Sequence, residues 1–301
     1  MKKLFRRIFS FLFLKVLVLT GVVKLRIRYI LKNYIPLALY FHNPDKELFE
    51  DIILWFKNEG FKFLSVQEFL LNFENKKKIK GAAWVSFDDG YEENLTNVLP
   101  ILKKYQIPAT FFISTKSIEE GFFWWDLVSS NSFADLNHLW KIPNKERVKI
   151  ISSINKEILS ISKRTISLQS LKKLSSYHLI TIGNHTDDHV ICNNCSNEEL
   201  NREIKICEAK LLEWVGDKYV RMFSYPNGDY DNRVKNIVKN NDMIAAFTNE
   251  PKLIKNKNDL YLIPRMGVVD NLSFSENLLH AIGIWQPLVN KFKKIICKAL
   301  P

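Results

Sequence analysis

From residue 36 onward, short apolar runs alternate with longer stretches of helical periodicity, and this alternation restricts the fold of the 301-residue chain more than any other feature. Apolar runs of strand length occupy residues 37–41, 61–64, 82–87, 109–114, 179–183, 220–224, 245–248 and 262–264. Helical stretches between them include 47–59, 95–105, 144–175 and 198–215. Strands that alternate with helices pair in parallel, with the helices as crossover connections. We therefore predict an α/β fold, and about seven such units in one run favour a (β/α) barrel over an open sheet.

The net charge of +12 is concentrated at the two ends of the chain. Residues 1–32 carry nine Lys and Arg and no acidic residue, and the tail after Asn290 carries four Lys and no acidic residue. Without these charges, residues 33–290 have a net charge of −1. A nearly neutral body argues against a basic groove, so we predict no nucleic-acid partner. Basic ends that flank apolar sequence favour an anionic membrane surface as a partner.

Residues 8–23 are sixteen residues with a single charge, Lys15. As a helix they would span about 24 Å, less than the ~30 Å hydrocarbon core of a bilayer. We favour an interfacial helix or shallow anchor. The alternatives are an uncleaved spanning anchor, a secretion signal, although no A-x-A cleavage site follows, and a helix packed on the domain itself. We predict a membrane-associated protein, with the cytoplasmic face favoured over a periplasmic or extracellular location, although basic flanks on both sides give no clear orientation.

Three of the predicted strands end in polar clusters, and functional residues of such folds lie just past the carboxyl ends of strands. Residues 86–90 read SFDDG, and two adjacent carboxylates repel each other unless a cation or a proton separates their roles. Residues 185–189 read HTDDH, and histidines four apart share one face of a helical turn, a common spacing of zinc ligands. Residues 225–228 read YPNG, a turn that can present backbone N–H groups to a substrate oxygen. Each cluster alone also fits a structural turn or structural histidines.

Together and in this order, the clusters resemble the motifs of the polysaccharide deacetylase family, the NodB-homology domain of the carbohydrate esterases of family 4. Residues 86–90 correspond to its T-F-D-D-G motif, and His185, Thr186 and His189 match its H-[ST]-x-x-H motif in full. Its R-x-P-Y-G motif is altered, because Ser224 stands at the arginine position and Asn227 at the tyrosine position. Divergent branches of the family with a small residue at the arginine position look similar. Shared segments extend the resemblance over residues 36–285: Tyr40-Phe41-His42, Trp124-Trp125-Asp126 and 263–268 (IPRMGV).

The resemblance implies a distorted (β/α) barrel with fewer than eight strands and one divalent metal ion, with zinc preferred. It assigns Asp89, His185 and His189 as the metal ligands and Asp88 as the catalytic base. Three protein ligands leave open coordination positions, as a catalytic metal requires. The backbone N–H of Asn227 would help to hold the oxyanion, a role that does not depend on the side chain.

Two further roles have only candidates. Arg265 is the candidate to orient the base in place of the missing motif arginine, because a planar guanidinium suits carboxylate binding; a surface or structural arginine is the alternative. A general acid must protonate the leaving amine, and His42, at a strand end, is better placed for it than His280 in an apolar helical stretch. The Trp124–Trp125 pair would either stack on a sugar ring or belong to the core.

The expected architecture is a membrane-associating segment at 1–35, a polysaccharide deacetylase (NodB-like) barrel domain at 36–290 and a basic amphipathic tail at 291–301. The predicted function is that of a metal-dependent hydrolase of carbon–nitrogen bonds other than peptide bonds. It would remove an N-acetyl or other small acyl group from a sugar of a bacterial-type surface polysaccharide or its precursor. The alternative is a catalytically impaired, carbohydrate-binding relic of the same fold, which the altered third motif would fit.

Overall fold

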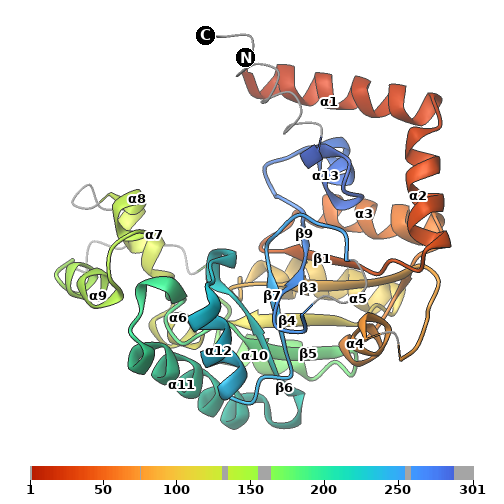
Figure 1. Ribbon diagram of the computed structural model, residues 1–301. Helices are drawn as coiled ribbons and strands as arrows, with labels where there is room; N and C mark the ends of the chain where they lie inside the picture. Colours follow the sequence, from red (N-terminus) through yellow and green to blue (C-terminus); the bar gives the residue numbers. More distant parts are fainter. Residues whose placement is uncertain (1, 75, 131–134, 155–163, 255–258, 288–301) are drawn as a thin grey trace. The chain divides into compact units, whose positions relative to one another are not determined.

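The computed structural model describes residues 2–74, 76–130, 135–154, 164–254 and 259–287 (Figure 1). The chain forms two compact units. The first unit comprises Met1–Ser86, Asn249–Asn258 and Pro264–Pro301, and the second comprises Phe87–Thr248 and Asp259–Ile263. The chain therefore passes from the first unit to the second within strand β3 (Ala82–Phe87), directly before the predicted aspartate pair.

The first unit contains short parallel strands covered by helices. Strand β1 (Leu37–Phe41) pairs in parallel with β9 (Met266–Gly267), and β2 (Lys62–Phe63) pairs in parallel with β3. The helices of this unit are α1 (Lys2–Leu19), α2 (Val22–Lys32), α3 (Lys46–Asn58), α4 (Val66–Phe73) and α13 (Phe274–Ala281). Capping boxes at Ser65 and Ser273 satisfy the first backbone N–H groups of α4 and α13.

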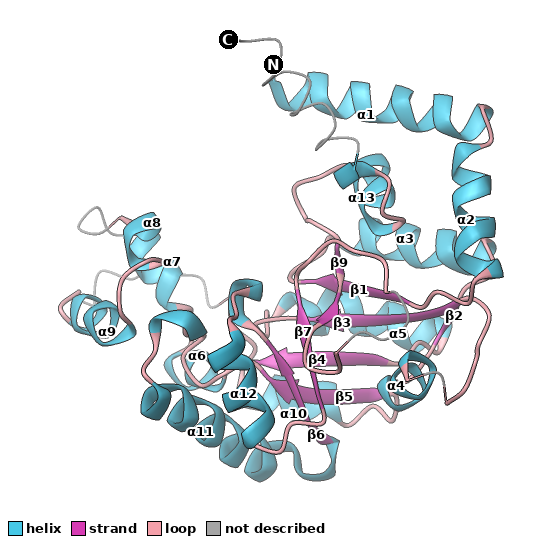
Figure 2. Cartoon of the chain, in the orientation of Figure 1, coloured by secondary structure: helices cyan, strands magenta, loops and turns pink. Residues whose placement is uncertain are grey.

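The second unit is built on four parallel strands that pair in chain order, β4 (Ala109–Ile113), β5 (Ile180–Asn184), β6 (Tyr219–Ser224) and β7 (Ala245–Thr248) (Figure 2). Ile113 is in register with Asn184, and Asn184 with Phe223. The carboxyl ends of these strands are therefore level, so the residues that follow them lie at one edge of the sheet. This register places the two later motifs side by side.

Helices connect the strands of the second unit. A π-helical turn (Asn94–Val98) leads into α5 (Leu99–Tyr105), and α10 (Leu168–Ser175), α11 (Asn197–Val215) and α12 (Asn232–Asn240) follow later in the chain. After β4 come four short helices, α6 (Thr115–Glu120), α7 (Trp124–Ser129), α8 (Leu136–Leu139) and α9 (Asn144–Ser152). Apolar side chains of α7 and α8 form a core of their own with Ile154.

Most of the predicted strands are confirmed, and two helical predictions are wrong in detail. Residues 144–175 are not one helix: α9 ends at Ser152, Thr165 forms a β-bridge with Tyr91, and Ser167 caps a new helix by accepting a hydrogen bond from the Ser170 N–H. The helix expected at 8–23 is broken at Gly21, which adopts φ 76°, a conformation that favours glycine. Strand β9 was not anticipated from the sequence.

The structure also bears on the membrane-associating segment. Among the described residues, no helix combines the length and the apolar character needed to cross a bilayer. The predicted boundaries at residues 35 and 290 remain predictions. The predicted basic tail at 291–301 lies outside the described residues.

Candidate active site

The aspartate pair lies directly after β3, at the start of the second unit. Asp88 and Asp89 are both buried, and Asp89 adopts φ 75°. Gly90 follows with φ 91°, and a Cβ atom there would lie 3.1 Å from the Cδ1 of Ile113. The turn therefore requires glycine for its backbone conformation and because the neighbouring side chain is so close. This explains in physical terms why the SFDDG sequence ends in glycine.

The two histidines lie on an irregular loop after β5, not on the helical turn that their spacing predicts. Asn184 accepts a hydrogen bond from the Thr186 N–H (2.9 Å), and the Thr186 hydroxyl accepts one from the Val190 N–H (3.1 Å). Thr186 and His189 adopt φ 64° and 42°. Hydrogen bonds between side chains and the backbone thus replace the backbone hydrogen bonds of a helix. They fold the loop so that both imidazoles face the Asp89 carboxylate.

Asp89, His185 and His189 form one buried cluster. The Nε2 atoms of His185 and His189 lie 3.2 and 3.3 Å from the same carboxylate oxygen, Oδ1 of Asp89. The candidate ligand atoms of the three residues lie within 4.8 Å of one another. The structure thus brings together the three residues that were predicted as metal ligands.

The hydrogen bonding of His185 fits a cation in this cluster. Its Nδ1 lies 2.8 Å from the backbone oxygen of Ser224, which can only accept, so Nδ1 carries a hydrogen atom. In the neutral ring, the lone pair of Nε2 then faces the Asp89 carboxylate, and the two repel each other. A cation between them turns this repulsion into coordination. A histidine that binds a metal usually donates its other ring N–H to a carbonyl or carboxylate, which fixes its tautomer and ring orientation.

Ser224 contacts both a candidate metal ligand, His185, and the predicted catalytic base, Asp88. Its backbone oxygen accepts the hydrogen bond from His185, and its hydroxyl donates to Oδ2 of Asp88 over 3.2 Å. The serine was predicted only as a departure from the family motif. Its hydroxyl instead orients the carboxylate that the arginine of the motif would orient. No local pattern predicts this contact, because it joins residues 136 positions apart.

Ser224→Ala should lower kcat by about tenfold to a hundredfold, since a hydrogen bond to a charged group is worth about 1.5–3 kcal/mol. The substitution keeps the backbone oxygen that His185 uses, so metal content should not change. Steady-state kinetics and elemental analysis of the purified variant test this expectation. Ser175→Ala, at a buried serine of α10, is the matched control. An unchanged rate, or loss of metal from the Ser224 variant, would contradict the assigned role.

Aromatic side chains surround His189. Trp125 meets the His189 ring edge-on at a centroid distance of 4.6 Å, and Trp140 lies 6.3 Å away. The Trp124 indole N–H reaches the backbone oxygen of His189 at 3.5 Å and is buried, whereas Trp125 is only half-buried. Trp124 therefore belongs to the core, and Trp125 keeps an accessible ring beside the candidate metal ligands. Trp140, which directly follows α8 and lies beside the histidine loop, was not identified from the sequence.

A buried ion network holds the far side of the histidine loop. Arg147 of α9 is 1% exposed; its guanidinium donates to Asp188 over 2.9 Å and lies 4.6 Å from the centre of the Trp124 ring. The Asp188 N–H donates to Glu203 of α11 over 2.8 Å. Asp188, which the sequence motif leaves unspecified, is thus a structural anchor. Nothing in the sequence singled out Arg147, because its partner is 41 residues away.

Glu203→Gln should make the stability of the protein less dependent on pH. Burial raises the pKa of Glu203 to about 7, from an ordinary value of 4.5. Below pH 4.5 the carboxyl is protonated in both states. Between pH 4.5 and 7 the unfolded chain loses the proton and the folded chain keeps it, so folding stability falls as pH rises, by about 3 kcal/mol in all.

Glutamine can still accept the Asp188 N–H and does not titrate, so the variant should exceed the wild type in unfolding free energy at pH 8 and match it near pH 4.5. Urea unfolding at both pH values tests this. Glu213→Gln, on the exposed face of the same helix, is the control. Parallel pH profiles for wild type and the Glu203 variant would contradict the expectation.

The remaining predicted site residues are divided between the units. Asn227 lies in the second unit, on the turn Pro226–Gly228 after β6, and is exposed. Arg265 belongs to the first unit and is fully buried, with hydrogen bonds to Ser86 and Asn249 of 2.9 and 2.8 Å, so it is not a surface arginine. His42 also belongs to the first unit and meets Tyr40 edge-on. The roles of these three residues remain predictions.

Backbone strain is concentrated in the motifs. Seven non-glycine residues of the described chain have positive φ, and four of them are Asp89, Thr186, His189 and Asn227. Such conformations persist only where the surrounding structure enforces them, and they cluster at functional sites. Strained backbone conformations therefore occur in all three motifs, and this observation marks the motifs as functional without any use of the sequence resemblance.

Comparison with known proteins agrees with this grouping. A family model described as polysaccharide deacetylase matches residues 75–246, more than half of the chain. A curated poly-beta-1,6-N-acetyl-D-glucosamine N-deacetylase of Staphylococcus aureus is 26% identical over 252 residues, which cover 79% of this chain and 75% of that protein. The protein of the same description from Staphylococcus epidermidis is 28% identical over 226 residues, covering 75% and 68%.

Solved structures show the same fold. The deacetylase PplD of Streptococcus pyogenes, in complex with acetate, matches with a TM-score of 0.62 and 20% identity and covers 82% of this chain and 97% of that chain. IcaB from Ammonifex degensii matches with a TM-score of 0.61 and 18% identity, with the same coverage. At these identities the similarity establishes the fold alone. These structures are NodB-type (β/α) barrels, so the predicted fold class is confirmed.

Proposed function

Because this chain belongs to the polysaccharide deacetylase family, we propose that it removes N-acetyl groups from a bacterial surface polysaccharide of β-1,6-linked N-acetylglucosamine. The staphylococcal relatives, which act on this polymer by their description, support the choice of substrate. The observation that carries the proposal is the buried cluster of Asp89, His185 and His189, with Asp88 held beside it by Ser224. A chain that had lost catalysis would have no need to keep both the three candidate ligands and the oriented Asp88 carboxylate.

Asp89, His185 and His189 would hold one divalent metal ion, and we propose zinc, since imidazole and carboxylate ligands in a three-residue set suit it. When bound, such an ion polarises the acetyl carbonyl and makes water easier to deprotonate. The donor set fits this group, because both imidazoles present Nε2 to one carboxylate oxygen. Hydrogen bonding through Ser224 keeps the His185 ring in that orientation.

The other residues of the site would carry out the proton transfers. Asp88 takes a proton from the attacking water as the oxygen adds to the acetyl carbon, and Ser224 holds the carboxylate in position. The N–H of Asn227 donates to the carbonyl oxygen as negative charge develops there. The carbon–nitrogen bond then breaks, acetate leaves, and the sugar amine takes a proton. We propose His42 as the donor of that proton and Arg265 as a further orienting group for Asp88.

The proposed function is tested with short oligomers of defined linkage. Purified protein is incubated with a β-1,6-linked N-acetylglucosamine pentamer and, separately, with the β-1,4-linked pentamer, and acetate and free amine are quantified. We expect equal amounts of acetate and amine from the β-1,6-linked pentamer and much less from the β-1,4-linked one. Acetate from neither pentamer, with metal bound to the protein, would favour the carbohydrate-binding relic and refute the proposal.

A further inference from the structure

Exposed apolar side chains are concentrated at the start of the chain. Fifteen large hydrophobic side chains are exposed among the described residues, and ten of them lie within residues 8–34. They are Ile8, Phe11, Leu12, Val16, Val18, Leu19, Val22, Leu25, Tyr29 and Tyr34. Isolated exposed hydrophobic residues are normal, but nine on two consecutive helices and Tyr34 directly after them mark an interaction surface.

These side chains are not the faces by which α1 and α2 pack on their own unit. Leu14 of α1 is buried, and Ser10 lies 3.2 Å from Ser273 at the start of α13. Val23, Ile27 and Ile30 of α2 are buried on one side of that helix. Each helix therefore already packs one side on its unit and exposes apolar side chains on another.

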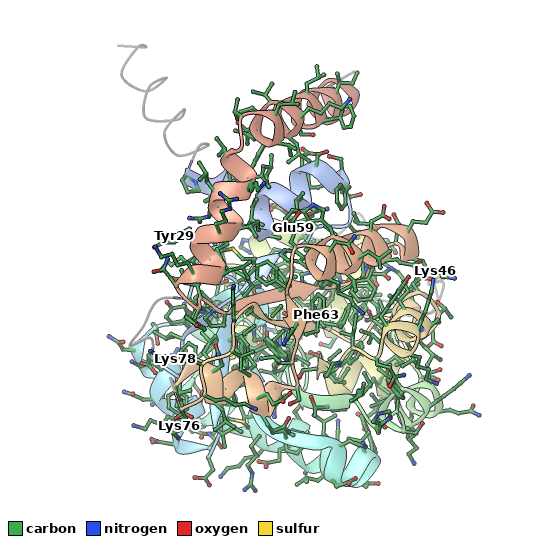
Figure 3. All side chains as sticks on the ribbon, turned by 90° about the vertical axis from the view of Figure 1, so that its right-hand side faces the viewer. Tyr29, Lys46, Glu59, Phe63, Lys76 and Lys78 are labelled. Carbon is green, nitrogen blue, oxygen red and sulfur yellow. The ribbon has the colours of Figure 1, made fainter. Side chains whose placement is uncertain are left out.

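The position of the two helices is fixed within the unit. The guanidinium of Arg26 donates to the backbone oxygens of Ile282 and Gly283, over 2.8 and 3.0 Å, and so ties α2 to the end of α13. The helices meet at a corner at Gly21 (Figure 1). Tyr29 lies on the outer side of α2 (Figure 3). The second apolar face thus belongs to the folded unit and is held outward.

An apolar groove continues this face. It has a volume of about 500 Å³ and lies between α2 and the chain after α13, lined by Val22, Leu25, Tyr29, Ile284 and Pro287 together with the stem of Arg26 and Gly283. An open groove of this size with almost no polar lining accommodates part of an acyl chain.

The charges that residues 1–32 carry are all of one sign. Residues 1–32 carry nine basic and no acidic residues, and Lys15, Lys24, Arg28 and Lys32 are exposed. The ammonium group of Lys15 lies 4.5 Å from the centre of the Phe11 ring, so charged and apolar groups alternate closely. Helices that combine exposed apolar residues with basic ones bind in the plane of an anionic membrane surface.

We propose that α1 and α2 form a docking surface for an anionic phospholipid bilayer. The apolar side chains insert among the acyl chains, the groove holds part of one acyl chain, and the basic residues contact the headgroups. The charge complementarity selects the anionic lipid. The helices lie on the surface and do not span it. The proposal is independent of the proposed catalytic activity, since no residue of the candidate active site takes part.

The experiment is co-sedimentation of the full chain with vesicles of phosphatidylcholine alone or with one quarter phosphatidylglycerol. The protein should bind the anionic vesicles at low salt, bind neutral ones at least tenfold more weakly, and be released by 1 M NaCl. Failure to bind anionic vesicles at low salt, or equal binding to both vesicle types, would overturn the proposal. Protein that only detergent releases would indicate a spanning segment and overturn it as well.

Matched variants test whether binding depends on the α1–α2 surface or on nonspecific hydrophobic contacts. The triple variant Leu12→Gln, Val16→Gln, Leu25→Gln should weaken binding at least tenfold, as should Lys15→Gln, Lys24→Gln, Arg28→Gln. The control Val148→Gln, Leu212→Gln, Ile244→Gln changes three exposed apolar side chains elsewhere and should bind like the wild type. Equal loss in the control and apolar variants would refute the assignment of the surface. Circular dichroism and thermal unfolding of every variant confirm that each is folded.

Discussion

His185→Ala and His189→Ala should each remove the metal and the hydrolytic activity together while the fold survives. Each imidazole faces the Asp89 oxygen with Nε2, so either substitution takes one donor from a three-residue set. A catalytic ion held by two protein donors binds far more weakly, and hydrolysis should fall by at least a thousandfold. The fold should survive, because strands β4 to β7 pair through their backbones and the core of this unit is apolar, unlike a zinc finger that folds only with its metal.

Elemental analysis, acetate release and urea unfolding of the same preparations test this prediction. His178→Ala is the matched control, because His178 is exposed and precedes the same strand. It should keep metal, activity and stability. A His185 or His189 variant that retains one equivalent of metal would show that the residue is not a ligand.

Asp88→Asn should keep the metal and lose rate by about 10²–10⁴, the usual contribution of a general base. Asparagine retains the shape of the side chain and can accept the hydrogen bond of Ser224, but it cannot take a proton. Asp89→Asn should behave differently, because its carboxylate oxygen is the one both imidazoles face. That variant should lose metal affinity as well as rate.

The two variants are compared by metal titration followed by single-turnover acetate release at saturating metal. High metal concentration should restore part of the rate in the Asp89 variant and none in the Asp88 variant. If the Asp88 variant loses metal affinity and the Asp89 variant does not, the roles of base and ligand are reversed.

The sequence predicted the parts of the molecule that local pattern controls. Strands such as Ala82–Phe87 and Ala245–Thr248 were located to the residue, because buried parallel strands are continuous apolar runs bounded by turns. The glycine after the aspartate pair is also part of a local pattern. The order and level ends of β4, β5 and β6 then bring the motifs together.

What the sequence could not predict depends on contacts between distant residues. Ser224 reads as a motif defect, and only the fold shows that its hydroxyl reaches Asp88 and its carbonyl reaches His185. Arg147 reads as one cation of a polar helix, yet it is buried against Asp188. The histidine spacing predicts a helical turn, but hydrogen bonds that the side chains of Asn184 and Thr186 accept from backbone N–H groups fold an irregular loop instead.

The most direct test of the proposed active site is a metal titration of the chelator-treated protein, read out as acetate release from the β-1,6-linked N-acetylglucosamine pentamer. We expect no activity without metal and a linear rise with added Zn²⁺ that reaches its plateau at one equivalent. The His189→Ala variant should show no such rise under the same conditions. Full activity of the metal-free protein, or a plateau that the His189 variant reaches equally, would contradict a catalytic metal held by Asp89, His185 and His189.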